Sequence, residues 1–175
     1  MMKSSVRIFV SIFALAFALN AFRAQAQTTN YQVYSLFVIN IAKYSAWPSA
    51  SSEFNITVLG KSKVFDELNK QAAGKSINGS VLKVSQVDAL TNVDNINIIY
   101  LSDGKSSMLD EVLKLTQGKP VMIVAEREGL FKKGAGFSFV LMDNNTLRFD
   151  INNTDLEKRQ IKISRSLSSL ANTIL

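Results

Sequence analysis

The sequence contains neither cysteine nor histidine. Without cysteine the chain has no disulfide, no thiolate metal site, no cysteine nucleophile and no N-terminal cysteine that could carry a lipid. Without histidine it lacks the usual base of nucleophilic triads and the commonest transition-metal ligand. A serine–lysine pair or paired carboxylates remain as catalytic alternatives. The two absences together favour a binding protein over an enzyme.

A concentrated basic surface is also lacking. The 175 residues include 20 basic and 14 acidic ones, and three of the basic residues precede residue 27, which leaves a net charge of +3 for the remainder. Charges of both signs are interspersed, as in Glu126-Arg127-Glu128 and in residues 155–159. Nucleic-acid-binding proteins concentrate basic residues on one face, so nucleic acid is not expected as a partner.

The first 26 residues have the layout of a secretory signal peptide. Lys3 and Arg7 precede an almost wholly apolar run over 8–22, and residues 24–26 place alanines at the two positions that a signal peptidase reads. The run of about 15 residues is shorter than the roughly 20 that span a bilayer as a helix, which disfavours the alternative of an uncleaved anchor. We therefore expect an exported protein whose mature domain covers residues 27–175.

Apolar periodicity in the mature domain predicts alternating helices and strands. Helices are expected over 31–47, 64–73, from Ser106 or Ser107 to Leu115, and from Asp155 onward; strands over 54–59, 81–87, 96–101 and 121–125; a turn-rich linker over 74–79; and a hairpin of strands 137–142 and 146–151. This pattern indicates a single-domain α/β sandwich. Its sheet is expected to be mixed, mostly parallel and flanked by helices, with a β-hairpin and helices at the C-terminal end.

Three Gly-Lys-Ser triplets, at residues 60–62, 74–76 and 104–106, resemble the end of a phosphate-binding loop. Such a loop needs another glycine five residues earlier, so that its backbone amides can surround the phosphates. None of the three triplets has that glycine. They are interpreted as turns and helix caps, and no nucleotide or other cofactor is expected.

Two groups of residues are candidates for contact with a partner or a ligand. Glu126, Arg127 and Glu128 follow the most apolar strand, and α/β proteins place ligands at the carboxyl ends of their strands; a solvated loop is the alternative. Tyr44 and Trp47 close the first helix, where aromatic side chains can either anchor a partner or cap the core.

Six segments, each a weak signal alone, are informative together because of the order in which they occur. They are an apolar helix ending in Trp-Pro over 36–48, a strand ending in Leu-Gly over 54–60, Gly-Lys-Ser-Ile-Asn-Gly over 74–79, Leu-Phe-Lys-Lys-Gly-Ala-Gly over 130–136, Arg-Phe-Asp-Ile-Asn over 148–152, and a closing helix over 163–171. In this order, and over nearly the whole mature domain, the chain resembles the YfiR family of small periplasmic bacterial proteins.

The resemblance implies a periplasmic regulator without catalytic activity, catalytic residues or a metal site. It implies a membrane-anchored signalling partner, a diguanylate cyclase or a sensor histidine kinase, which the protein restrains, and a capacity to form homodimers. Some relatives contain disulfides, and the absence of cysteine excludes redox control of that kind here. The alternative function is a periplasmic sensor that binds a small molecule in a pocket at the carboxyl edge of the sheet.

Overall fold

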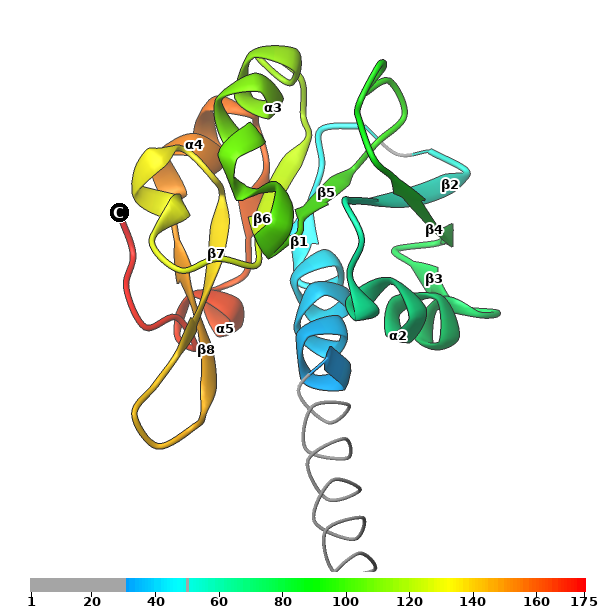
Figure 1. The fold of residues 1–175 in the computed structure, drawn as a ribbon. Helices are drawn as coiled ribbons and strands as arrows, with labels where there is room; N and C mark the ends of the chain where they lie inside the picture. The colour runs from blue at the N-terminus through cyan, green and yellow to red at the C-terminus, as the bar shows by residue number, and fades with distance from the viewer. Residues whose placement is uncertain (1–30, 50) are drawn as a thin grey trace, which may run out of the picture.

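The computed structural model describes residues 31–49 and 51–175 (Figure 1), so the signal-peptide prediction for residues 1–26 lies outside the described residues. Residues 31–43 are helical. The elements that follow are β1 (Ser45–Ala46), β2 (Glu53–Leu59), α2 (Lys63–Ala72), β3 (Ser76–Ile77), β4 (Ser80–Val87), β5 (Ile98–Leu101), η1 (Asp103–Met108), α3 (Leu109–Leu115), β6 (Met122–Ala125), η2 (Leu130–Lys133), β7 (Phe137–Leu141), β8 (Leu147–Ile151), α4 (Asn153–Lys158), β9 (Lys162–Ile163) and α5 (Arg165–Ser168).

The main sheet has seven strands in the order β3-β4-β2-β5-β6-β7-β8. The five strands from β4 to β7 are parallel, whereas β3 and β8 are antiparallel to their neighbours at the two edges. Numbered along the chain, the parallel strands have the order 2-1-3-4-5, which reverses direction between β2 and β5. The predicted α/β fold with a mixed, mostly parallel sheet is confirmed.

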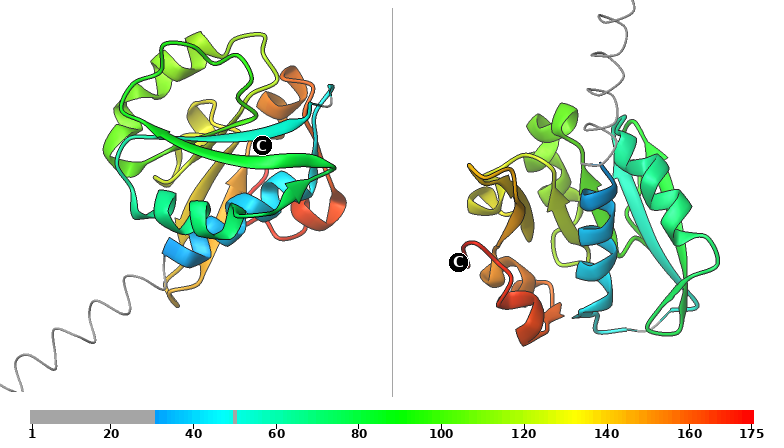
Figure 2. Two further views of the ribbon diagram at one scale, coloured as in Figure 1. Left: turned by 90° about the vertical axis from the view of Figure 1, so that its right-hand side faces the viewer. Right: turned by 90° about the horizontal axis from the view of Figure 1, so that it is seen from below.

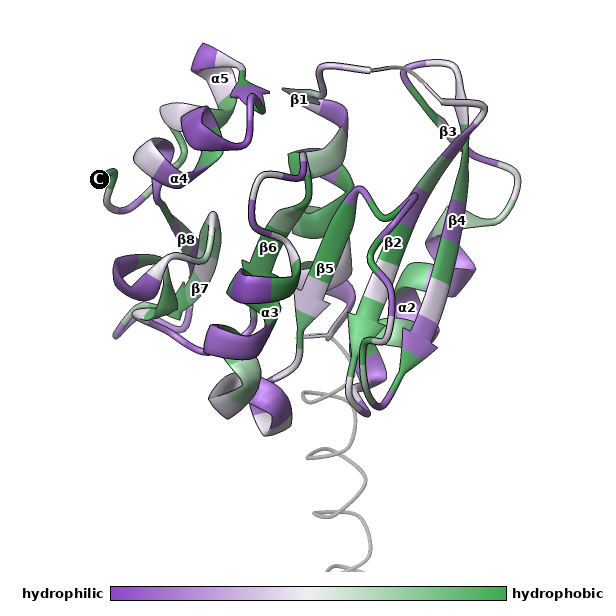
Figure 3. Ribbon diagram, turned by 90° about the horizontal axis from the view of Figure 1, so that it is seen from above, coloured by the Kyte–Doolittle hydropathy of each residue, from purple (hydrophilic) through white to green (hydrophobic). Residues whose placement is uncertain are grey.

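Both faces of the central strands β5 and β6 are buried, which accounts for their continuous apolar sequences. On one face, Tyr100 and Met122 belong to a core that also includes residues of helix 31–43 and α2. On the other face, Ile99 and Ile123 pack with residues of α3. Figure 2 shows helix 31–43 and α2 beside each other on the first face, and Figure 3 shows the apolar strands between these helices and α3.

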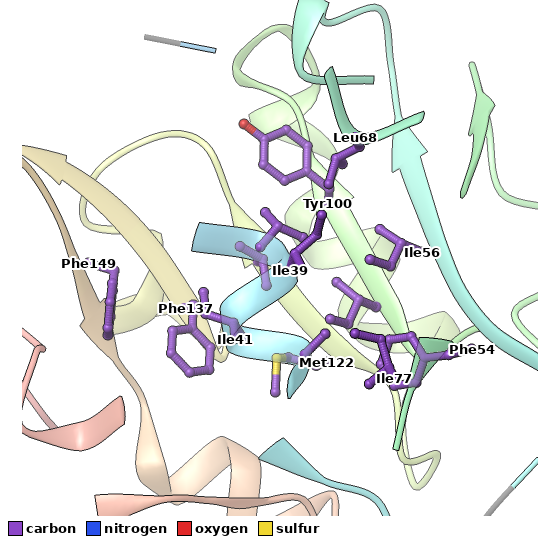
Figure 4. Close-up of a cluster of buried hydrophobic side chains, with 14 of the residues drawn as sticks. Ile39, Ile41, Phe54, Ile56, Leu68, Ile77, Tyr100, Met122, Phe137 and Phe149 are labelled. Carbon is purple, nitrogen blue, oxygen red and sulfur yellow. The ribbon is translucent and has the colours of Figure 1, made fainter. Parts of the chain in front are cut away.

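Helix 31–43 lies along the sheet because its apolar side chains fill the space above four strands. Figure 4 shows Ile39 and Ile41 among side chains from β2, β5, β6 and β7. The helix is also tied to α2, since the Gln71 amide donates a hydrogen bond to the Ser35 hydroxyl. Burying one such side chain stabilises a fold by about 1.5–3 kcal/mol, so this helix is a structural part of the domain.

Several expected boundaries were wrong, because short strand pairings replace part of an expected helix or linker. The first helix ends at residue 43, before Trp47, because Ser45–Ala46 pairs with β9 as a short antiparallel ribbon. The same ribbon interrupts the continuous C-terminal helical region that was expected, leaving the short helices α4 and α5. The expected linker 74–79 contains β3, which pairs with the start of β4.

The helix expected to begin at Ser106 or Ser107 starts earlier, with the 3₁₀ segment η1 at Asp103. Ser106 is buried and its hydroxyl caps neither η1 nor α3. The hairpin of β7 and β8 lies where it was predicted and is joined by an Asp-Asn-Asn turn, and a 3₁₀ turn covers Leu130–Lys133.

The last residues extend the sheet beyond β8. The Ile151 amide donates to the Thr173 carbonyl, and the Leu175 amide donates to the Ile151 carbonyl, both at 2.9 Å. Ile174 forms a parallel bridge with Ile151. This short tail therefore covers the carboxyl half of an edge strand that would otherwise present unpaired backbone groups to solvent.

Candidate functional site

The turns that follow β2, β5 and β6 meet at the point where the strand order reverses. Open α/β sheets bind ligands at this position, because the connections on either side of the reversal diverge to opposite faces and leave a crevice. Here the crevice is a pocket of about 550 Å³, which we call the switch-point pocket; it is lined by Tyr31, Lys61, Ser62, Lys63, Asp66, Gln86, Asp103, Gly104 and Glu126.

Gly60 allows the β2–α2 turn to lie against the β5–η1 turn. Its φ of +91° falls in the left-handed region, and a Cβ at this position would collide with the side chains of Ser102 and Lys105. The Ser102 hydroxyl joins the two turns by donating to the Leu59 carbonyl at 2.7 Å, and the side-chain amide of Gln86, in β4, donates to the Gly60 carbonyl at 2.8 Å. The wall of the pocket is thus built on rigid backbone.

Glu126 is the central charged residue of the pocket. Its Oε2 accepts hydrogen bonds from the Asp103 backbone N–H at 3.2 Å and from the Ser62 hydroxyl at 3.4 Å. Ser62 also caps α2, where its hydroxyl accepts a hydrogen bond from the Val64 N–H. Burial raises the pKa of Glu126, and these hydrogen bonds oppose part of that increase.

Two tyrosines adjoin this carboxylate. Burial is the main cause that raises the pKa of Tyr100 well above its usual value, and the charge of Glu126 adds to the increase; the pKa of Tyr34 is raised in the same way. The Tyr100 hydroxyl is fully buried and has no hydrogen-bond partner among the described residues. Figure 4 shows this hydroxyl pointing out of the apolar cluster. Both phenols are therefore neutral at physiological pH, and each hydroxyl can donate one hydrogen bond and accept others.

The structure separates the three candidate residues that follow β6. Arg127 forms an exposed ion pair with Asp103, with its Nε 2.7 Å from Oδ1, and this contact lowers the pKa of Asp103. Glu128 is exposed and does not line the pocket. Glu126 and Arg127 are thus brought together around Asp103, whereas Glu128 occupies the solvated loop that was the alternative.

Sequence reasoning missed the other walls of the pocket, among them Tyr31, Ser62 and Gln86. One signal was present for Ser62, because the triplet Gly60-Lys61-Ser62 follows a strand and opens a helix. For Tyr31 and Gln86 no local pattern exists, since their proximity depends on the order of the strands.

Tyr44 and Trp47 lie at the opposite, amino edge of the parallel strands, and we call this region the aromatic edge. Trp47 packs edge-on against Phe54, with ring centroids 4.8 Å apart, so it does cap the core. It also borders two hollows of about 340 and 230 Å³, which share Glu53 and Asn97 at the starts of strands. Tyr44 is 52% exposed.

The described residues contain no group of three or more acidic side chains that could hold a metal ion. Within the same residues, no helix is both long enough and apolar enough to cross a membrane.

A family model described as YfiR/HmsC-like matches residues 31–172. A comparison with curated proteins finds no match. The matched segment begins with helix 31–43, which carries Tyr31 of the pocket and leads to the aromatic edge, and it includes every strand of both sheets. It also contains all six segments in which the sequence resembled this family. The chain therefore belongs to the YfiR/HmsC-like family.

Proposed function

We propose that this protein is a non-catalytic periplasmic regulator that binds and restrains a membrane-anchored signalling protein, either a diguanylate cyclase or a sensor histidine kinase. The observation that carries the proposal is the family match over residues 31–172. YfiR/HmsC-like membership supports a periplasmic regulatory role in cyclic-di-GMP signalling. Restraint of the partner requires that the protein bind its inactive state more tightly than its active state.

The chemistry of the pocket agrees with a regulator. Glu126 is the half-buried carboxylate, but its neighbours at the reversal are a serine used as a helix cap and an aspartate held by Arg127. The Ser62 hydroxyl lies beside this carboxylate at 3.4 Å, but it also accepts a hydrogen bond from the Val64 N–H as the cap of α2, so the pair supports the turn rather than an activated nucleophile. Since the chain has no histidine or cysteine, binding is the simpler use of this site.

We assign the partner contact to the aromatic edge and the helix face that leads to it. Leu36 and Tyr44 are 51% and 52% exposed; Leu36 lies on helix 31–43, and Tyr44 directly follows its last residue. Exposed apolar and aromatic side chains beside hollows are typical of protein interfaces. The expected occupant is an apolar periplasmic segment of the membrane-anchored partner.

The test measures partner output in cells and in reconstituted membranes. Deleting the gene is expected to raise cyclic-di-GMP or kinase output several-fold, and the wild-type gene is expected to restore the low level. Tyr44→Ala and Leu36→Ala should fail to restore it, because each removes an exposed contact. Leu141→Ala is the matched control, since Leu141 is 50% exposed at the end of β7, next to the turn of the β7–β8 hairpin.

Unchanged output of every membrane-anchored cyclase and sensor kinase after deletion would refute the regulatory role. Equal restoration by all three variants would instead refute the assignment of the contact to the aromatic edge. The homodimer implied by the family resemblance stays a prediction, and light scattering on the same purified proteins measures it.

A further inference from the structure

The switch-point pocket contains a carboxylate that is only partly satisfied. Glu126 accepts both of its hydrogen bonds through Oε2. Among the described residues, no hydrogen bond reaches its Oε1 and no lysine or arginine lies within ion-pair distance of it. A half-buried carboxylate without a cation is costly, and it is the kind of group that a bound cation would stabilise.

The position of Glu126 argues against an anionic ligand at the reversal. In many doubly wound proteins a ligand's phosphate accepts hydrogen bonds from backbone amides at this point. Here the amide of Asp103, the first residue of η1, already donates to the Glu126 carboxylate. The protein's own anion therefore occupies the place that a phosphate would take.

The remaining walls can accommodate a cation. Of the five charged residues that line the pocket, Asp103 is neutralised by Arg127, which leaves two acidic and two basic side chains. Lys63 extends its Nζ to 5.9 Å from the centroid of the Tyr31 ring, within the range of about 6 Å at which an aromatic face attracts a cation. The aromatic wall thus already has a cation beside it, while Glu126 has none.

The buried Tyr100 hydroxyl is the other polar group beside this carboxylate. It forms no hydrogen bond of normal geometry within the described structure, and, besides burial, both the charge of Glu126 and hydrogen bonding to that carboxylate raise its pKa. Buried hydroxyls are nearly always hydrogen-bonded in native proteins. If the donor group of a bound ligand fixed the Glu126 carboxylate through one oxygen, the other oxygen could accept a hydrogen bond from the Tyr100 hydroxyl.

We propose that the switch-point pocket binds a small organic cation that carries a primary ammonium or guanidinium group, with Glu126 as its counterion and the Tyr31 ring as an aromatic wall against its alkyl chain. The pocket of about 550 Å³ matches the size range of small-molecule sites, about 300–1,000 Å³. This binding activity goes beyond partner regulation and does not depend on it.

The test uses the purified protein with putrescine and agmatine as probes. Thermal unfolding and calorimetric titration are recorded near pH 7.5 at constant ionic strength, with inorganic phosphate as the anionic comparison. A saturable response is expected for at least one of the two amines, with a rise in Tm of about 3–6 °C at ten times the dissociation constant. Phosphate is expected to produce no saturable rise.

Variants connect the response to the pocket. Glu126→Gln keeps the shape of the side chain and is expected to weaken amine binding at least tenfold. Glu128→Gln, two residues along the same loop and outside the pocket, should bind as the wild type does. Tyr31→Ala is a further variant that removes the aromatic wall and should weaken binding several-fold, even if the Glu126 variant were poorly folded.

Three results would overturn the proposal. They are the absence of a saturable response to both amines, equal amine affinity in folded Glu126→Gln and wild-type protein, and a response to phosphate without one to the amines. None of these outcomes bears on the regulatory role, which the partner-output experiment tests separately.

Discussion

The charge of Glu126 lowers the stability of the unliganded fold, but the proposed binding of a cation requires it. Burial raises its pKa, which means that the folded protein binds this proton more tightly than the unfolded chain does. The side chain therefore contributes stability below its unfolded pKa, about 4.3, and this contribution is lost as the pH rises through the folded value. At neutral pH the charged carboxylate destabilises the unliganded fold.

Replacing Glu126 with glutamine should consequently raise the Tm at pH 7, by about 2–4 °C if the gain is near 1 kcal/mol. The gain should shrink as the pH is lowered toward 4, where the wild-type carboxyl becomes neutral. Calorimetry across this range measures both proteins, with Glu128→Gln as the exposed control. Tyr34, Tyr100 and Asp103 also influence this carboxyl, so substituting any of them should shift the pH at which the stability gain is half lost. A lower Tm for Glu126→Gln than for the wild type at pH 7 would contradict the argument.

A second prediction concerns the glycine beside the pocket. Gly60→Ala combines a strained positive φ with a collision against Ser102 and Lys105, and we expect a loss of about 2–4 kcal/mol in unfolding free energy. Gly79→Ala is a matched control, since Gly79 has a φ of +89° but no atom within 4 Å of the added Cβ. Urea unfolding measures the loss of unfolding free energy in both variants, and the difference between the two losses is the contribution of the collision. Equal losses would show that the collision contributes nothing.

At the residue scale, sequence reasoning found the carboxylate but not its surroundings. Glu126 was predictable because it follows a strand whose apolar residues are buried on both faces. Tyr31 and Gln86 were not, because they reach the pocket only through the packing of helix 31–43 and the pairing of β4 with β2.

Among the elements, α4 is held to the sheet by an ion pair that is almost completely buried. Arg159 lies 2.7 Å from Asp155 and donates to the carbonyls of Thr116 and Val121 at 3.2 and 3.0 Å. One guanidinium therefore joins α4 to the segment between α3 and β6. Its planar, multiple donors suit this role better than a lysine would.

Arg159→Ala should lower the free energy of unfolding by about 3–5 kcal/mol, because it leaves Asp155 charged and two buried carbonyls without donors. Guanidinium unfolding measures the loss. Arg165→Ala, at an exposed position in α5, should cost less than about 0.5 kcal/mol. If the double variant of Asp155 and Arg159 were as unstable as Arg159→Ala alone, the unpaired charge would not be the cause.

Elements longer than three residues were largely predictable, and the two-residue strands were not. The buried strands β5 and β6 show continuous apolar runs, and the β7–β8 hairpin has an Asp-Asn-Asn turn. By contrast, β1, β3 and β9 each form through one short pairing. A two-residue strand is too short to show a periodic sequence pattern, so its formation depends on the segment with which it pairs.

For the molecule as a whole, the C-terminal tail protects the edge of the sheet. Deleting residues 172–175 would remove the hydrogen bonds that this tail forms along β8 and expose part of its backbone. We expect a lower Tm and concentration-dependent self-association. Hydrogen exchange should accelerate at the amides of Ile151 and Asn153, which donate to the tail. Ile174→Ser, which leaves the backbone bonds in place, should change exchange little; unaltered exchange after the deletion would contradict the role of the tail.

The place of β2 between two parallel neighbours also has a kinetic consequence. The β7–β8 hairpin joins adjacent segments and can form in about 1–10 μs. β2 must instead find β4 and β5 across long stretches of chain, pairing Glu53 with Val81 and Ile56 with Ile98, and chains dominated by such distant pairings fold more slowly. Since the switch-point pocket is made from the ends of β2, β5 and β6, it should be among the last features to form. A refolding chain would then regain its sheet edges before it regained the ability to bind.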